Sequence, residues 1–183
     1  MNDRDTILLA EDREDDIILI QRAFKAGGIR FPLMVVRDGE EAINYLSGIG
    51  RYSDRNLYPI PALFLLDLTL PVTDGFEVLR WIRTQPELKD LPVIVLTASD
   101  RIRDVNQAYR LGAYSFLVKT LDFLDAVALS QSITDYWLKV KKNAPAELPA
   151  QQWPEKANLV PPAVAAEYPR PAPPQPEIGP SGA

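Results

Sequence analysis

Cysteine and histidine are both absent from this chain of 183 residues. Without cysteine, the protein forms no disulfide and offers no thiolate to a metal, which fits a reducing compartment. Without histidine, it lacks the base of Ser-His-Asp and Cys-His nucleophile systems and the usual ligand of catalytic zinc, and it cannot carry a phosphohistidine itself. Any reactive chemistry must therefore depend mainly on carboxylates.

Long apolar runs and an excess of basic residues are also lacking. No stretch approaches the roughly 20 apolar residues of a membrane span, and the N-terminal sequence MNDRDTILLAED has too short an apolar run for a signal peptide. We therefore expect a cytoplasmic protein with no membrane partner. The formal net charge of -5 argues against a nucleic-acid partner, because phosphate binding requires clustered Lys and Arg.

Short apolar segments alternate with helical patterns as far as about Val140. This alternation is typical of an open parallel sheet with helices on both faces. We predict an α/β fold with a doubly wound, five-stranded parallel sheet in the flavodoxin-like order 2-1-3-4-5. The expected strands are Thr6–Ala10, Leu33–Val36, Ala62–Leu66, Pro92–Leu96 and Ser115–Val118.

Two longer segments differ from this regular pattern. Ser47–Pro61 is polar and rich in turn residues, which predicts a long surface loop. Beyond Asn143 the chain contains eleven of its 17 prolines and shows no periodicity, so this segment cannot bury enough apolar surface to fold. We therefore expect one domain over residues 1–143, ending in a helix from about Leu121 to Lys141, and a disordered, proline-rich tail over residues 144–183.

Polar side chains stand at the carboxyl ends of four predicted strands, where open parallel sheets gather functional groups. Three carboxylates in one pocket repel by roughly 4 kcal/mol per pair at about 4 Å and an effective dielectric near 20, so this pocket requires a cation. Mg²⁺ fits, because it uses few carboxylates and leaves room for phosphate oxygens. The side chains are Glu11 and Asp12 after the first strand, Asp67 after the third, Thr97 after the fourth and Lys119 after the fifth.

This combination of groups indicates phosphoryl transfer. The cation, the Lys119 ammonium and the Thr97 hydroxyl together neutralise the oxygens of a phosphoryl group in transfer. Asp67 is the candidate nucleophile and would form an acyl phosphate.

Each signal has an ordinary explanation when taken alone. An aspartate after a strand is usually a turn or cap residue, and a lysine is usually on the surface. We interpret Glu14–Asp16 as solvated acids at a helix N-terminus, and Asp74–Gly75 as a turn and helix-start signal only. The functional interpretation depends on complementary groups at four strand ends.

Four segments resemble the signature segments of response-regulator receiver domains: ILLAEDREDD, LLDLTLPVTDG, VIVLTAS and SFLVKT. The resemblance covers about Asp5 to Lys142 and implies a single-domain two-component regulator. Such a protein takes phosphate from a sensor histidine kinase and signals by a conformational switch. It is not an enzyme in the usual sense, although it catalyses its own phosphotransfer and dephosphorylation. The resemblance implies that Asp67 is the phosphoacceptor, that Glu11, Asp12, Asp67 and the backbone carbonyl of Thr69 bind Mg²⁺, that Thr97 and Phe116 form the switch pair, and that Lys119 binds phosphate.

One position departs from the family pattern, since Thr120 replaces the cis proline that usually follows the lysine. This replacement, the long loop after the second helix and the lack of an output domain most resemble small regulators paired with phytochrome-type sensor kinases. The sequence shows no helix-turn-helix pattern of a transcription factor.

Two other functions remain open. A haloacid dehalogenase-type phosphatase also uses a strand-end aspartate and magnesium, but it has a second acid where this chain has Thr69. A pseudo-receiver would be an interaction module with an inactive pocket, and the intact acids argue against it.

The final predicted helix also indicates self-association. Its apolar residues spread beyond the single stripe that a sheet can bury, so we expect a homodimer through the face of the fourth helix, fifth strand and fifth helix. Tyr136 and Trp137 are the expected aromatic anchors of that interface. The alternative is that the proline-rich tail folds over this patch.

Overall fold

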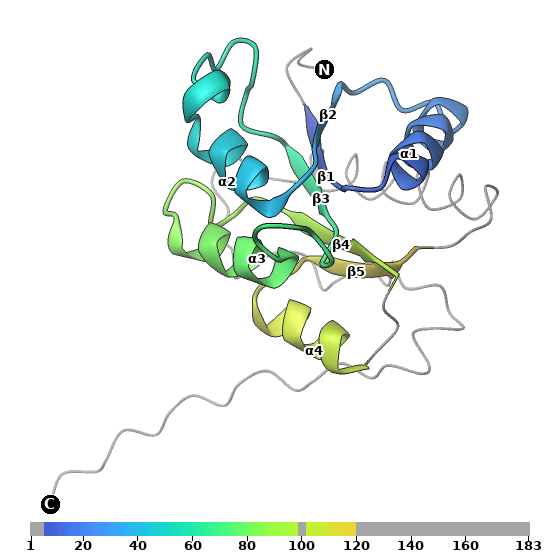
Figure 1. The fold of residues 1–183 in the computed structure, drawn as a ribbon, viewed down its shortest axis with the longest axis vertical. Helices are drawn as coiled ribbons and strands as arrows, with labels where there is room; N and C mark the ends of the chain where they lie inside the picture. Colours follow the sequence, from blue (N-terminus) through green and yellow to red (C-terminus); the bar gives the residue numbers. More distant parts are fainter. Residues whose placement is uncertain (1–5, 99–101, 120–183) are drawn as a thin grey trace, which may run out of the picture.

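A five-stranded parallel sheet forms the centre of the molecule (Figure 1). The computed structural model describes residues 6–98 and 102–119. The strand order is β2-β1-β3-β4-β5, so the predicted fold class and topology are confirmed. Each strand lies within one residue of its predicted limits: β1 Ile7–Ala10, β2 Leu33–Val36, β3 Leu63–Leu66, β4 Val93–Thr97 and β5 Ser115–Val118.

Helices cover both faces of the sheet because successive strand residues point to opposite sides. Leu8 and Phe64 belong to the core beneath α2, α3 and α4, whereas Leu9 and Leu65 pack toward α1. Figure 1 shows α1 on one side of the sheet and the other three helices on the other. The helices are α1 Glu14–Ala26, α2 Gly39–Ser47, α3 Gly75–Thr84 and α4 Ile102–Arg110.

Aspartate side chains cap the N-termini of two helices, α2 and α3. Asp38 accepts a hydrogen bond from the Glu41 amide (2.6 Å) at the start of α2. Asp74 accepts one from the Glu77 amide (2.9 Å) at the start of α3, which confirms the predicted helix-start signal. Such caps satisfy backbone amides that have no partner inside the helix.

The segment after α2 is more ordered than predicted. It contains a short 3-10 helix, Gly50–Tyr52, and the Tyr52 ring is buried against Tyr45 and Tyr58. The Arg55 guanidinium donates to the carbonyl oxygens of Tyr45 (2.8 Å), Leu46 (2.6 Å) and Tyr58 (3.2 Å), so it joins the segment to the C-terminal end of α2. The predicted surface loop is thus confirmed for most of Ser47–Pro61, but local composition did not indicate the 3-10 helix or the tertiary contacts of Tyr52 and Arg55.

Gly75 allows α3 to start directly against the segment that follows β3. A Cβ atom at this position would lie 2.2 Å from the Asp67 carbonyl oxygen and 2.6 Å from the Leu68 Cα. The Gly75 amide also donates to the Leu68 carbonyl (3.0 Å). The interpretation of Asp74–Gly75 as only a turn and helix-start signal was therefore incomplete, because the packing itself excludes a side chain at Gly75.

Several predictions concern residues outside the described ranges. They are the final helix Leu121–Lys141, the tail 144–183, the departure at Thr120 and the interface residues Tyr136 and Trp137. Within residues 6–98 and 102–119, no helix has the length and apolar character needed to cross a bilayer.

We predict that Arg55→Gln lowers the free energy of unfolding by about 2 kcal/mol, because hydrogen bonds from a charged donor to buried carbonyls are lost. Arg80→Gln on the exposed side of α3 is the matched control and should change it by less than about 0.5 kcal/mol. Urea denaturation followed by circular dichroism measures both values. Equal effects of the two substitutions would contradict this role of Arg55.

We further predict that Gly75→Ala destabilises the protein by about 2–3 kcal/mol, although alanine favours helices, because backbone must move to admit the methyl group. Gly50→Ala serves as the comparison: Gly50 has φ 62° but open space around its Cβ position, so only the cost of about 1 kcal/mol for a left-handed alanine applies. Thermal unfolding of the two variants gives the order. If Gly75→Ala were the milder change, the close contact of Gly75 with the Asp67 and Leu68 backbone would not be what excludes a side chain there.

Candidate functional site

The register of the sheet brings the predicted site residues to one edge. Ala10 pairs with Leu66, so Glu11 and Asp67, the residues that follow them, leave neighbouring strands at the same level. Thr97 pairs with Val118, and the amide of Lys119 donates to the Thr97 carbonyl (2.8 Å). The carboxyl ends of β1, β3 and β5 therefore bring the carboxylates and the Lys119 ammonium together, and Thr97 ends β4, the strand between β3 and β5.

Three of the acids form a cluster that suits a divalent cation. Carboxylate oxygens of Glu11, Asp12 and Asp67 all lie within 4.8 Å of one another. Glu11 and Asp67 are buried, whereas Asp12 is exposed at the mouth of the cluster. Oxygen ligands of this kind are those that Mg²⁺ and Mn²⁺ prefer, and an exposed side leaves positions for water or phosphate. These residues therefore fit the predicted metal site.

The ammonium of Lys119 lies among these carboxylates. Its Nζ donates to Asp67 Oδ2 (2.7 Å) and forms an ion pair with Glu11 Oε2. Only 14% of the Lys119 side chain is exposed, so this residue is not an ordinary surface lysine. It offsets part of the repulsion that buried carboxylates would otherwise exert on one another.

Burial and pairing shift the pKa values of these groups. Desolvation raises the pKa of Glu11, and the hydrogen bond and charge of Lys119 offset part of that rise. For Lys119, desolvation lowers the pKa, but the hydrogen bonds and negative charges of Asp67 and Glu11 together outweigh it, so the net shift is upward. The ammonium is therefore held in its charged form beside the carboxylates.

The remaining predicted residues lie on or next to the strands that carry these groups. The Thr69 amide donates to Asp67 Oδ1 (3.1 Å), which orients the carboxylate from the side opposite Lys119. Thr97 is fully buried at the end of β4. Phe116, on the neighbouring strand, is 5% exposed and belongs to the core beneath α2, α3 and α4. Its ring is thus already inside the protein in this conformation.

Asp16 also reaches the site, which the sequence interpretation missed. Its Oδ2 accepts a hydrogen bond from Lys119 Nζ at 3.1 Å. The interpretation of Glu14–Asp16 as solvated acids of a helix N-terminus was correct in placing them in the first turn of α1, but it was wrong to exclude Asp16 from the pocket. No spacing signal marks Asp16 in the sequence, because α1 begins at Glu14 and Asp12 lies before it.

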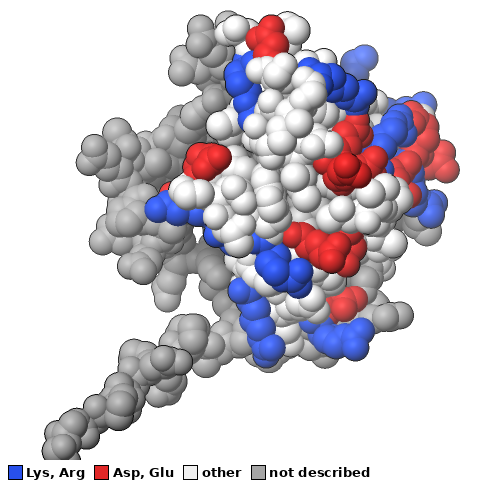
Figure 2. Space-filling view, turned by 60° about the vertical axis from the view of Figure 1, so that its left-hand side comes forward, with Lys and Arg blue, Asp and Glu red and all other residues white. Residues whose placement is uncertain are grey.

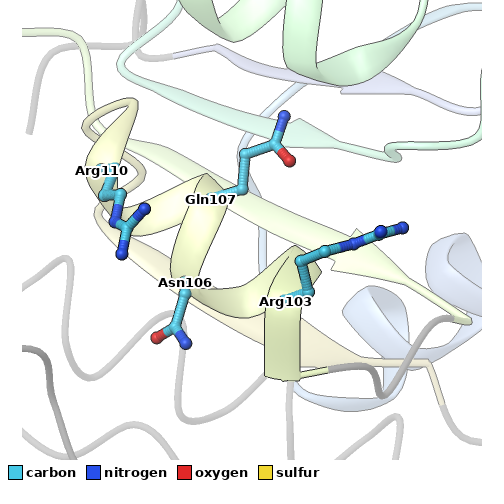
Figure 3. Close-up of a pocket in the computed structure, with 4 residues that line it drawn as sticks. All are labelled: Arg103, Asn106, Gln107 and Arg110. Carbon is cyan, nitrogen blue, oxygen red and sulfur yellow. The ribbon is translucent and has the colours of Figure 1, made fainter.

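A separate pocket of about 500 Å³ lies on α4 (Figure 3). Its described lining residues all end in polar or charged groups. They are Arg103, Asn106, Gln107 and Arg110.

Known proteins share the sequence and the fold. The model of the response regulator receiver domain family matches residues 7–131. Response regulator Rcp1 of Synechocystis sp. is 40% identical over 133 residues, which cover 73% of this chain and 88% of that protein.

Two solved structures are similar over most of their length. The phosphorylated cyanobacterial phytochrome response regulator RcpA has a TM-score of 0.68 and 36% identity, covering 73% of this chain and 94% of the other. The Mn²⁺-bound form of response regulator Rcp1 has a TM-score of 0.67 and 38% identity, covering 79% and 99%. Receiver domains bind divalent metal, as that structure illustrates, and the acidic cluster described above offers matching ligands. The family match and the site geometry agree, and this chain belongs to the response-regulator receiver domain family.

Proposed function

We propose that this regulator accepts a phosphoryl group on Asp67 from the phosphohistidine of a sensor histidine kinase and signals through the resulting change of shape. The convergence of the acid cluster and the Lys119 ammonium on one Asp67 carboxylate is the observation that supports this proposal most directly. The Asp67 carboxylate is buried on the protein side, and the cluster opens at Asp12, where a donor can approach.

The reaction is a displacement at phosphorus. An Asp67 carboxylate oxygen forms a bond to the phosphorus atom while the phosphorus–nitrogen bond of the phosphohistidine breaks, and the imidazole nitrogen keeps the electron pair. Lys119 exchanges its contact with Asp67 Oδ2 for the phosphoryl oxygens, while the Thr69 amide keeps the carboxylate oriented. Hydrolysis of the acyl phosphate by water then restores Asp67, a step that the domain catalyses itself.

Mg²⁺ is the proposed cofactor, held by Glu11, Asp12, Asp67 and the backbone carbonyl of Thr69. The three carboxylates supply the oxygen ligands this ion prefers, and a similar protein binds the related ion Mn²⁺. When bound, Mg²⁺ supplies positive charge that offsets the charge on the transferring phosphoryl group.

Thr97 and Phe116 are the proposed switch pair. They lie on adjacent strands, and the Thr97 hydroxyl is expected to move toward the phosphoryl group. Because the Phe116 ring is already buried, we expect the switch to begin with Thr97, and the ring to adjust within the core.

A phytochrome-type sensor kinase is the proposed partner. Receiver domains pair with sensor histidine kinases such as phytochromes, and the similar RcpA is a phytochrome response regulator.

A cytoplasmic location without a membrane or nucleic-acid partner is also proposed. Two features support the lack of a nucleic-acid partner: the net charge of -5 and the mixing of acidic and basic side chains on the face shown in Figure 2. The two alternative functions have less support, since no compared protein favours the phosphatase and the acids of an active pocket are all present.

We predict that Asp67→Asn abolishes phosphorylation by a small phosphodonor, because the amide replaces the nucleophilic oxygen. Intact-protein mass spectrometry should show one added phosphoryl group on the wild type in Mg²⁺ and none in EDTA. Asp90→Asn, an exposed aspartate before β4, is the matched control and should be phosphorylated normally. If the Asp67→Asn protein gained phosphate, or EDTA had no effect, the site assignment would be wrong.

We also propose a homodimer through the α4–β5 face and the helix predicted after β5, with Tyr136 and Trp137 near its centre. Trp137→Glu should reduce the mass measured by light scattering to that of a monomer, because a charge would be buried in the interface. Trp153→Glu in the proline-rich segment is the control and should remain dimeric. A wild type that is monomeric at tens of micromolar, with or without phosphate, would overturn this proposal.

A further inference from the structure

The ammonium of Lys119 has three carboxylate partners, and they differ in kind. Glu11 and Asp67 belong to the acidic cluster that fits a divalent cation. The third partner, Asp16, comes from α1 and lies outside that cluster, with its Oδ2 3.1 Å from Lys119 Nζ. The Lys119 ammonium therefore connects two proposed metal ligands, Glu11 and Asp67, with Asp16, which is not a proposed ligand.

This arrangement creates a competition when a divalent cation binds. The ion needs oxygens of Glu11 and Asp67, and those same groups contact the ammonium in this structure. Two cations on shared oxygens also repel each other. Lys119 must therefore give up part of its contact with these two groups, yet it must stay near Asp67 to meet the phosphoryl oxygens.

Asp16 is placed to hold the ammonium during that exchange. Its side chain is only 22% exposed, and the next residue, Ile17, is buried in the core, which fixes this turn of α1. Arg13 Nε lies 3.6 Å from the same Oδ2, but the Arg13 side chain is 67% exposed, so it is the weaker partner.

We propose that Asp16 is a positioning residue that lets Lys119 and the divalent cation occupy the pocket together. The ammonium is shared among three carboxylates in this structure, and Asp16 becomes its principal partner when the divalent cation binds. The Asp16–Lys119 contact is then stronger when the metal is bound. Asp16 therefore raises the metal affinity by more than a nearby carboxylate that acts through its negative charge alone. This role rests on the proposed phosphotransfer function, since Lys119 is kept beside the acceptor for that reaction.

A double-mutant cycle in Mg²⁺ affinity tests the proposal without any phosphodonor. Isothermal titration calorimetry would compare the wild type, Asp16→Asn, Lys119→Met and the protein with both changes. Asp15→Asn is the matched control, because it removes the same charge from the first turn of α1 at an exposed residue.

We expect Asp16→Asn to raise the Mg²⁺ dissociation constant about tenfold and Asp15→Asn about twofold. In the Lys119→Met background, where no ammonium competes, Asp16→Asn should cost only about twofold. Asp16→Glu, which restores the carboxylate, should recover part of the lost affinity. Circular dichroism and thermal unfolding of each variant confirm that folded proteins are compared.

Equal effects of Asp16→Asn and Asp15→Asn would overturn the proposal, and so would an Asp16→Asn effect of unchanged size in the Lys119→Met background. Failure of this inference is distinguishable from failure of the proposed function. A wild type that is phosphorylated on Asp67 but shows no coupling between Asp16 and Lys119 refutes the positioning role alone. A coupled pair in a protein that accepts no phosphate refutes the phosphotransfer function, and with it the purpose assigned to Asp16.

Discussion

The buried ion-pair network around Lys119 is the interaction on which the site depends. Burying Glu11 and Asp67 next to each other is unfavourable unless positive charge compensates both desolvation and repulsion. Lys119 supplies that charge from the end of β5, and the neighbouring Asp67 and Glu11 carboxylates raise its pKa, which favours the charged ammonium. One ammonium does not balance the charge of the three clustered carboxylates, so the pocket also favours a divalent cation.

Close backbone packing positions Asp67, the proposed acceptor, within this network. Gly75 admits the start of α3 against the Asp67 and Leu68 backbone, and a side chain at Gly39 would meet the Thr73 carbonyl at 1.9 Å. Between them, Val72 has φ 67° and is 75% exposed, an unfavourable conformation for a β-branched residue. The segment after Asp67 thus contains a strained residue, Val72, and the close packing at Gly39 and Gly75 holds this segment in place.

Much of the site follows from the sequence because parallel strands end at one edge of their sheet. That rule alone brings Glu11, Asp67 and Lys119 together once the strands are identified. Asp16 escaped the same reasoning because its role depends on how α1 is rotated against the sheet. The burial of Tyr52 was missed for a similar reason: it depends on Arg55 and two other tyrosine rings rather than on local pattern.

A crystal structure with Mg²⁺ and a phosphoryl analogue tests the central claim most directly. We expect the analogue on Asp67, with Lys119 Nζ moved from Asp67 Oδ2 to an oxygen of the analogue. We also expect that the Lys119 ammonium stays within hydrogen-bonding distance of the Asp16 carboxylate. An analogue bound away from Asp67, or a Lys119 still paired with Asp67 Oδ2 beside it, would contradict the account.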